Sequence, residues 1–403
     1  MPAEWEPHEA TWIGWPHNVT DWPGKFATIP WVYGEIVRKI APGEKLRVLV
    51  NSAQHKAQAQ RLLARIGVDP ARVEFFRFPT NRGWTRDFGP VFVARDAGPA
   101  NTAATASGMA GGRRLSAAFH KYDDDASGVR DSGFGVRRTN RRSPVFLCES
   151  RAPNPEPREI AIVRFRFNGW AKYPNWRLDD RVPERVAAAL GYPLLPARAG
   201  DRDFVLEGGS IESNGRGTLV TTEECLLDPK TQVRNPGLSR EEIEAALRDN
   251  LGVANVLWLG RGIAGDDTHG HVDDVCRFVD PRTVVLCRER NPRDPNYKAL
   301  EENRERLEGM RLEDGSKIEV VALPMPAPLH FQGQRLPASY ANFYISNAAL
   351  LVPTFNDPND RVALGALAEL ITDRPVIGIH AVDLAWGLGT LHCLTQQQPT
   401  RSG

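Results

Sequence analysis

Pairs of apolar runs joined by turn residues recur along this chain, and this recurrence restricts the fold more than any other feature. Short apolar runs separated by a tight turn are typical of β-hairpins. The pairs are 205–213 with 217–222 across Asn214-Gly215, 271–279 with 283–288 across Asp280-Pro281, and 341–345 with 348–353 across Ser346-Asn347. Segments with helical periodicity fill the intervals between the pairs, so strands and helices alternate.

The helical segments carry recognisable start signals. Ser239 and Glu242 form a capping box ahead of one segment, and Pro358 precedes another. The predicted helices are 31–41, 54–66, 181–190, 240–250, 297–309 and 359–371. The sequence therefore predicts an α/β protein.

The segment 96–160 differs from the rest of the chain. Gly, Ala, Ser and Arg dominate there, and no periodicity is sustained. Such a composition is typical of an inserted, partly disordered loop. It separates a fourth pair of runs, 88–94 and 161–167, and so replaces the turn of one more hairpin.

One chemically capable residue stands at the start of each hairpin, and a cysteine opens a last strand. These residues are Asp87, Glu207, His271, Asn342 and Cys393. Without the insert they lie about 50 to 70 residues apart. The spacing predicts a single domain, 1–403, in which five ββα modules close into a ring and the strand starts converge on one cavity.

Charge and cysteine content exclude several classes of function. The 51 basic and 50 acidic side chains leave a net charge of +1, so neither nucleic acid nor an anionic membrane is an expected partner. Five scattered cysteines without a Cys-x-x-Cys pair argue against a disulfide framework and against a thiolate zinc site. The acidic, proline-broken start does not resemble an export signal, and no run approaches a membrane span, so we expect a cytoplasmic protein.

The segment from Asp266 to Asp274 concentrates two histidines and four acids in nine positions. One interpretation is a zinc site formed by His269, His271 and Asp273. In the other, period-two alternation places the same three side chains on one face of a strand, where they supply an acid/base imidazole beside a carboxylate.

Cys393 differs from the other cysteines. Cys148, Cys225, Cys276 and Cys287 lie in contexts typical of small core residues, whereas glycines, a histidine and a glutamine run surround Cys393. This polar context is expected to favour the thiolate.

Two further clusters place an acid against glycine at a strand end, namely Asp87 before Gly89 and Glu207 before Gly208. With Asp273 they supply three carboxylates around one thiol and one imidazole. Paired, charge-assisted hydrogen bonds from such a set suit a planar guanidinium. The sequence therefore predicts a guanidine substrate.

At this point the chain resembles the agmatine deiminase family, a branch of the guanidine-modifying (pentein) enzymes that also includes bacterial peptidylarginine deiminases. The matching motifs are Glu4-Trp5-Glu6-Pro7-His8, Trp84-x-Arg86-Asp87-x-Gly89-Pro90, Glu207-Gly208-Gly209-Ser210, Gly270-His271-Val272-Asp273, Pro337-Ala338-Ser339-Tyr340-x-Asn342, Pro353-Thr354-Phe355-x-Asp357-Pro358 and His392-Cys393-x-Thr395-Gln396-Gln397. The resemblance implies a five-bladed α/β propeller around a central active site, with no metal and no organic cofactor.

The resemblance also implies the role of each site residue. Cys393 is expected to be the nucleophile and His271 the acid/base. Asp87 and Asp273 are expected to hold the guanidinium, Glu207 to polarise or position, and Trp84 to line the pocket. A homodimer is the oligomeric state that the resemblance suggests.

The expected reaction is hydrolysis of agmatine to N-carbamoylputrescine and ammonia through a covalent amidino-cysteine, a step in putrescine synthesis. Agmatine is favoured over peptidylarginine because the secreted deiminases of the family need an export signal, which we do not recognise at the start of this sequence. The alternatives are a peptidylarginine or free-arginine deiminase, a metal-dependent hydrolase built on His269, His271 and Asp273, and a propeller that binds guanidines without turnover.

Overall fold

The computed structural model describes residues 1–96 and 158–401. Most of the predicted insert, residues 97–157, lies outside the described residues. Its predicted bounds were too wide, because Asp96 still belongs to strand β4 and residues 158–160 already belong to β5.

Among the described residues, five sheets contain the same three-strand arrangement, and one of them adds a fourth strand at its edge. In each, a first strand runs antiparallel to a central strand, and a helical crossover leads from the central strand to a parallel third strand. Parallel neighbours need such a crossover, whereas antiparallel neighbours need only a turn. The sequence-predicted alternation of hairpins and helices is confirmed.

Four of these sheets are continuous along the chain. They are β4(Val91–Asp96)-β5(Arg158–Arg164)-β6(Leu194–Pro196), β9(Glu212–Ser213)-β10(Thr218–Thr222)-β11(Asn255–Leu259), β12(Cys276–Phe278)-β13(Thr283–Arg288)-β14(Glu319–Pro324) and β17(Tyr344–Ile345)-β18(Leu350–Thr354)-β19(Val376–His380). Two short hairpins accompany them, β7(Arg198–Ala199)-β8(Arg202–Asp203) and β15(His330–Phe331)-β16(Gln334–Arg335).

The fifth sheet joins the two ends of the chain. Its order is β20(Thr395–Pro399), β1(His8–Gly14), β2(Lys45–Leu49) and β3(Val73–Phe76). The glutamine run lies in β20, and all five residues of this strand are buried. Gln398 accepts a hydrogen bond from Trp12 Nε1 at 2.9 Å, and its own amide donates to the Tyr192 hydroxyl at 2.8 Å. Partners of this kind make the burial of amides tolerable.

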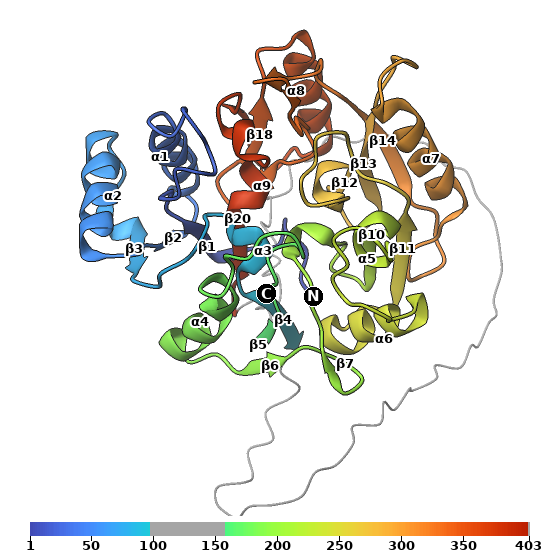
Figure 1. The fold of residues 1–403 in the computed structure, drawn as a ribbon, viewed down its shortest axis with the longest axis horizontal. Coiled ribbons are helices and arrows are strands. Elements are labelled where there is room, and N and C mark those ends of the chain that lie inside the picture. Colours follow the sequence, from blue (N-terminus) through green and yellow to red (C-terminus); the bar gives the residue numbers. More distant parts are fainter. Residues whose placement is uncertain (97–157, 402–403) are drawn as a thin grey trace, which may run out of the picture. The chain divides into compact units, whose positions relative to one another are not determined.

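The six predicted helices are confirmed, each within two residues of its expected ends. They are α1(Ile29–Ile40), α2(Ala53–Arg65), α4(Val182–Leu190), α6(Arg240–Leu251), α7(Asn296–Gly309) and α8(Pro358–Leu370). In Figure 1 they lie toward the edge of the view, with the sheets nearer its middle. The capping box of α6 forms as predicted, because Ser239 and Glu242 each bond the other's backbone N–H.

Short helices and 3-10 helices complete the described residues. They are η1(Pro70–Arg72), α3(Thr85–Phe88), η2(Asp179–Arg181), η3(Gly208–Ser210), α5(Glu223–Leu227), η4(Val272–Asp274), η5(Leu384–Gly387) and α9(Leu391–Leu394). Four of them, α3, η3, η4 and α9, stand directly before the first strand of a module. The predicted first strands were therefore too long, since 205–211, 271–275 and 341–343 are not strands. Polar site residues interrupt the alternation of side chains there, and local turns satisfy their backbone groups.

The central strands are buried on both faces. All five residues of β10 are buried, as are the first five of β13 and the first four of β18. Strands covered on both faces are expected to be apolar without strict alternation, as β13 and β18 largely are, whereas β10 buries three threonines beside Leu219 and Val220. The largest group of buried apolar side chains forms one core, and a smaller group packs around β10 and α6.

Candidate active site

The turns before the first strands bring the predicted site residues together. Asp87 lies in α3, Glu207 immediately precedes η3, His271 immediately precedes η4, and Cys393 lies in α9. The turn η3 contacts both α3 and η4, and α3 contacts α9. Residues up to 306 positions apart thus share one site. Cys393 itself does not open the last strand as predicted, because β20 begins two residues later.

His271 is held between two carboxylates. Its ring Nδ1 lies 3.7 Å from Asp87 Oδ1, and its Nε2 lies 3.8 Å from Glu207 Oε2. The side chain is 1% exposed. Burial opposes the positive form of the imidazole. The charge of Asp87, followed by the side chains of Cys225 and Glu207, outweighs burial and raises the pKa of His271 well above its ordinary value. The imidazole is therefore set up as a proton donor.

Gly209 is the backbone position that allows this close packing. A Cβ at Gly209 would lie 2.6 Å from His271 Nδ1 and 2.9 Å from Asp87 Oδ1. Its backbone N–H also donates to Asp87 Oδ1 at 3.1 Å. The glycine of the Glu207-Gly208-Gly209 motif thus permits a close approach and supplies a hydrogen bond.

Asp87 is a buried carboxylate that accepts one hydrogen bond besides that from Gly209. Trp170 Nε1 donates to its Oδ2 at 2.9 Å. Burial raises the pKa of Asp87 to about 6, and the charges of Asp273 and Glu207 add to the rise, while His271 and the Trp170 bond oppose it. Near neutral pH the carboxylate is mostly ionised and close to its protonation threshold.

Glu207 is fixed by a buried arginine. Arg234 Nε donates to Glu207 Oε1 at 3.2 Å, and both side chains are fully buried. Burial disfavours the glutamate charge, but Arg234 and then His271 outweigh it and lower the pKa of Glu207 to about 2. Glu207 is therefore a permanent negative charge beside the imidazole.

Asp273 is oriented by His392, the residue that directly precedes the predicted nucleophile. His392 Nδ1 lies 2.7 Å from Asp273 Oδ2, and its Nε2 lies 2.9 Å from Glu4 Oε2. Burial opposes ionisation of Asp273, but the hydrogen bond and charge of His392 outweigh it and lower the pKa of Asp273. The other oxygen, Oδ1, has no hydrogen-bond partner among the described residues.

Glu4 continues this network through two buried arginines. Arg86 Nη2 and Arg277 Nη2 each donate to Glu4 at 2.9 Å. Arg277 Nε also donates to Glu212 Oε2 at 2.8 Å. A buried carboxylate is stable only with such partners, so the N-terminal motif Glu4-Trp5-Glu6 acts as a support for the site.

Cys393 is contacted by an amide and a carboxylate. Asn342 Nδ2 lies 3.1 Å from the sulfur, and Asp273 Oδ2 lies 3.7 Å from it. Asn342 is itself fixed, because its Oδ1 accepts from Thr390 Oγ1 at 2.8 Å and its Nδ2 donates to Asp274 Oδ1 at 3.0 Å. The predicted landmark Asn342 therefore orients the thiol.

The expectation that polar surroundings favour the thiolate was wrong for the protein without ligand. Burial raises the pKa of Cys393 well above its ordinary value, and the charges of Asp273, Asp274 and Asp87 add to the rise. The Asn342 hydrogen bond acts in the other direction. His392, which the sequence places beside the thiol, faces Asp273 and Glu4 instead.

A pocket leads to Cys393 and Asp87. Its buried lining includes Trp84 and Trp170, and its half-exposed lining includes Arg82, Tyr173, Asp267, Thr268 and Leu388. Trp84 therefore lines the pocket as predicted. Gly387 and Gly389 pass close to its ring, since a Cβ at either position would lie 2.9 Å from a Trp84 carbon. The glycines before Cys393 make room for this indole.

His269 does not join the other predicted site residues. It has a φ of +64°, and its Nε2 lies 2.8 Å from Asp228 Oδ2. The segment from His269 to Asp273 is not a strand, so the predicted common face was wrong. Among the described residues, the donor atoms of His269, His271 and Asp273 do not gather within metal-ligand distance. The predicted zinc site at these residues is therefore wrong as well.

Sequence reasoning missed several supporting residues. Arg86 and Glu4 stand inside quoted motifs, and their place in those motifs was an available signal. Trp170, Arg234 and Arg277 lie outside any motif with site chemistry, and no local pattern indicated them. Cys225, Cys276 and Cys287 are buried as predicted, whereas Cys148 lies outside the described residues.

Comparisons with known proteins agree with this geometry. Residues 1–399 match the family described as Porphyromonas-type peptidyl-arginine deiminase.

The chain belongs to this family.

Two curated members are agmatine deiminases. The one from Ectopseudomonas mendocina is 30% identical over 426 residues, covering 100% of this chain and 96% of its own. The one from Medicago truncatula is 33% identical over 425 residues, covering 99% of this chain and 96% of its own.

Solved structures of this family share the fold. An agmatine deiminase of Enterococcus faecalis aligns with a TM-score of 0.78 at 29% identity, covering 100% of this chain and 96% of its own. An agmatine deiminase of C. jejuni with substrate bound aligns with a TM-score of 0.73 at 25% identity, covering 99% of this chain and 96% of its own. The fold is therefore the α/β pentein fold of these enzymes. In residues 1–96 and 158–401, no helix combines the length and apolar character that crossing a membrane requires.

Proposed function

We propose that this chain is an agmatine deiminase, which hydrolyses agmatine to N-carbamoylputrescine and ammonia. The observation that carries the proposal is the buried set of Cys393, His271, Asp87 and Asp273, in which His271 contacts Asp87, Asp273 contacts Cys393, and Cys393 and Asp87 line the pocket. The curated relatives and the solved structures of the family support the substrate, because they are agmatine deiminases.

Asp87 and Asp273 are proposed to hold the guanidinium. Asp273 Oδ1 has no hydrogen-bond partner among the described residues, although it is buried, so an N–H donor of a ligand would satisfy it. Asp87 lines the pocket itself. Two carboxylates around a planar cation make charge-assisted, directional hydrogen bonds and expose its carbon to the thiol.

The cation also activates the nucleophile. In the protein without ligand, burial and three aspartates keep the thiol of Cys393 protonated. A guanidinium between Asp87 and Asp273 neutralises those charges, so the thiol pKa falls and its proton is lost to solvent. Substrate binding thereby produces the thiolate that attacks.

The reaction then proceeds in two halves. The thiolate sulfur bonds to the guanidinium carbon, and the π electrons move onto nitrogen. His271 protonates one nitrogen, the C–N bond breaks, and ammonia departs. The amidino group stays bonded to the cysteine sulfur. A water molecule adds to that carbon and transfers a proton to His271, and the C–S bond breaks to give the urea product and the thiolate.

Glu207 is proposed to keep His271 cationic and oriented. Its ionised carboxylate lies 3.8 Å from the imidazole Nε2, opposite the Asp87 contact at Nδ1. A permanent anion beside the ring stabilises the imidazolium that donates the first proton. Glu207 is held in turn by Arg234.

The charges of the pocket favour agmatine over arginine. Among the described residues that line it, three carry a carboxylate, Asp21, Asp87 and Asp267, and Arg82 alone carries a positive charge. Arg82 Nη1 already donates to Asp21 Oδ1 at 2.6 Å. Lys172 likewise pairs with Asp267, so the second cation of agmatine is proposed to take the place of one of these cations, whereas the α-carboxylate of arginine meets no unpaired cation among the described lining residues.

The five modules are proposed to form a five-bladed propeller around this site. The shared strand order of the five sheets and the pairing of β20 with β1 across the chain ends support this arrangement. The same arrangement accounts for the site residues, since each stands before the first strand of its module.

The test is ammonia release by the EDTA-treated protein from agmatine, free arginine and an arginine peptide. We expect release from agmatine, its loss in Cys393→Ala, and its retention in Cys276→Ala, which removes another buried thiol. Release from the peptide or from arginine would reassign the substrate. If no ammonia is released from any of the three but a guanidine ligand stabilises the protein, a binding protein is favoured. If EDTA treatment abolishes an activity that Cys393→Ala retains, a metal-dependent hydrolase is favoured.

A further inference from the structure

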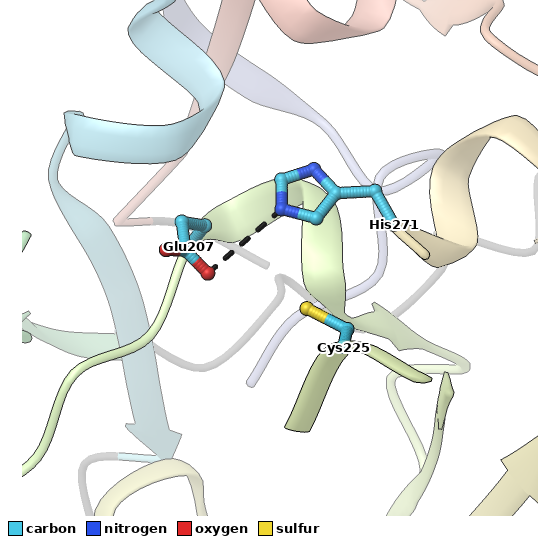
Figure 2. Close-up of side chains that lie close together, drawn as sticks. All are labelled: Glu207, Cys225 and His271. Carbon is cyan, nitrogen blue, oxygen red and sulfur yellow. Dashed lines mark ion pairs between the residues drawn. The ribbon is translucent and has the colours of Figure 1, made fainter. Parts of the chain in front are cut away.

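The side chains of Glu207, Cys225 and His271 form a compact group of possible metal ligands. Each offers one donor atom, and the three atoms lie within 4.8 Å of one another. Figure 2 shows the three side chains converging from separate parts of the chain, with the thiol of Cys225 directed between the other two. Cys225 comes from α5, so the group includes a residue to which the proposed reaction gives no role.

The donor atoms of this group are buried and underused. Three of these atoms have no hydrogen-bond partner among the described residues: the two ring nitrogens of His271 and Oε2 of Glu207. The three residues are at most 2% exposed. Buried polar atoms without partners are costly, so an ion that bonds Nε2 of His271 and Oε2 of Glu207 would be favoured, while Nδ1 keeps its contact with Asp87.

We propose that Glu207, Cys225 and His271 bind one Zn²⁺ ion that inhibits the enzyme. Thiolate, imidazole and carboxylate are the ligands that zinc takes in proteins, with bonds of about 2.0–2.3 Å. Two ligands of a tetrahedral ion at such distances stand roughly 3.3–3.8 Å apart. The 3.8 Å between His271 Nε2 and Glu207 Oε2 meets that spacing closely, and the thiol needs a shift of about 1 Å at most.

Zinc at this position would stop the proposed reaction, so the inhibitory part of the inference rests on the proposed function. The ion replaces the proton on His271 Nε2 and that of the Cys225 thiol, both of which pass to solvent, so His271 cannot deliver a proton to the leaving ammonia. Arg234 is the charge that opposes the ion, because it donates to the other oxygen of Glu207. The fourth zinc position stays free for water, as in sites that are not purely structural.

Zinc binding tests the site without any need for activity. The metal-free full-length protein competes with a chromophoric chelator for Zn²⁺, as wild type and as Cys225→Ala, Cys393→Ala and Cys287→Ala. Loss of even an outer-shell partner of a ligand weakens metal sites by roughly 10- to 100-fold, so Cys225→Ala should weaken binding by at least ~10-fold. Cys393→Ala and Cys287→Ala should bind one ion as the wild type does.

Two results would overturn the assignment. Unchanged binding in Cys225→Ala would remove the thiol from the site. Loss of binding in Cys393→Ala would place the ion on the proposed nucleophile instead. Cys225→Ser, which keeps the size of the side chain, repeats the test if circular dichroism shows that the alanine variant is misfolded.

Inhibition of ammonia release tests the consequence. With each variant normalised to its own rate, the zinc concentration for half inhibition should rise at least ~10-fold in Cys225→Ala and stay constant in Cys287→Ala. Tight zinc binding without inhibition would refute the inhibitory role while leaving the site. If the wild type releases no ammonia from any guanidine, the proposed function fails, and the binding experiment still decides the metal site.

Discussion

His392 provides a sharp test of how Asp273 is kept ionised. One ring nitrogen contacts Asp273 at 2.7 Å and the other contacts Glu4 at 2.9 Å. A glutamine amide reaches the position of the distal nitrogen, and an asparagine amide reaches that of the proximal one. His392→Gln therefore loses the Asp273 contact, whereas His392→Asn keeps a neutral donor there and serves as the matched control.

The magnitude follows from the kind of hydrogen bond that is lost. A hydrogen bond to a charged group contributes about 1.5–3 kcal/mol, and a neutral one about 1 kcal/mol. Loss of the bond in His392→Gln should lower kcat/KM for agmatine by about 10- to 100-fold, because 1.4 kcal/mol corresponds to tenfold. His392→Asn keeps a donor to the Asp273 carboxylate and gives up the contact with Glu4, so it should lose about 5-fold at most.

The pH profile separates this mechanism from simple misfolding. His392 lowers the pKa of Asp273, so its removal raises that pKa, and the carboxylate becomes protonated at a higher pH. Below about pH 6 the protonation of Asp273 should then add to that of Asp87, so the acidic limb of kcat/KM should be steeper in His392→Gln than in the wild type, and raising the pH should restore part of the activity. Equal losses in both variants, or an acidic limb of unchanged steepness, would refute the reasoning.

Three further predictions rest on other contacts. Gly209→Ala should lower kcat at least ~100-fold with a native circular dichroism spectrum, because its Cβ would lie 2.6 Å from His271 Nδ1; near-normal turnover would contradict it. In the wild type, kcat/KM should fall about tenfold per pH unit below about 6, where Asp87 loses the charge that binds guanidinium; a flat profile from pH 5 to 7 would count against this role. Arg277→Met removes the arginine shared by Glu4 and Glu212; Glu4 keeps Arg86 and His392, but Glu212 loses its cation, so the free energy of unfolding should fall by about 3–5 kcal/mol in denaturant titrations; a loss below about 1 kcal/mol would show that water replaces the arginine.

The elements of the fold were largely predictable because they are local. Apolar periodicity, turn residues and the Ser239 capping box lie within a few positions of the structures they specify, so α6 and the hairpins were found. The first strands were predicted too long for the opposite reason. Residues such as His271 and Asn342 look like strand starts, but their side chains and backbone serve contacts with distant segments.

The site residues with distinctive chemistry were also predictable. Cys393, Asp87, Glu207 and His271 stand beside glycines at regular spacing, and the structure brings them together. Their partners were not, because Trp170 and Arg234 carry no local signal and meet the site only through the fold. The histidine pair of the Asp266–Asp274 segment was misjudged, since a single backbone turn at His269 directs the two rings to different partners.

The sequence by itself determined the alternation of strands and helices, the family, and the identity of the reactive groups. These depend on residue type and on short-range spacing, which a linear chain displays. Only the tertiary structure decided the protonation of those groups. Burial and charges from distant segments raise the pKa of Cys393 and of His271 and lower that of Glu207, because Coulomb interactions depend on distance in space and on exclusion of water.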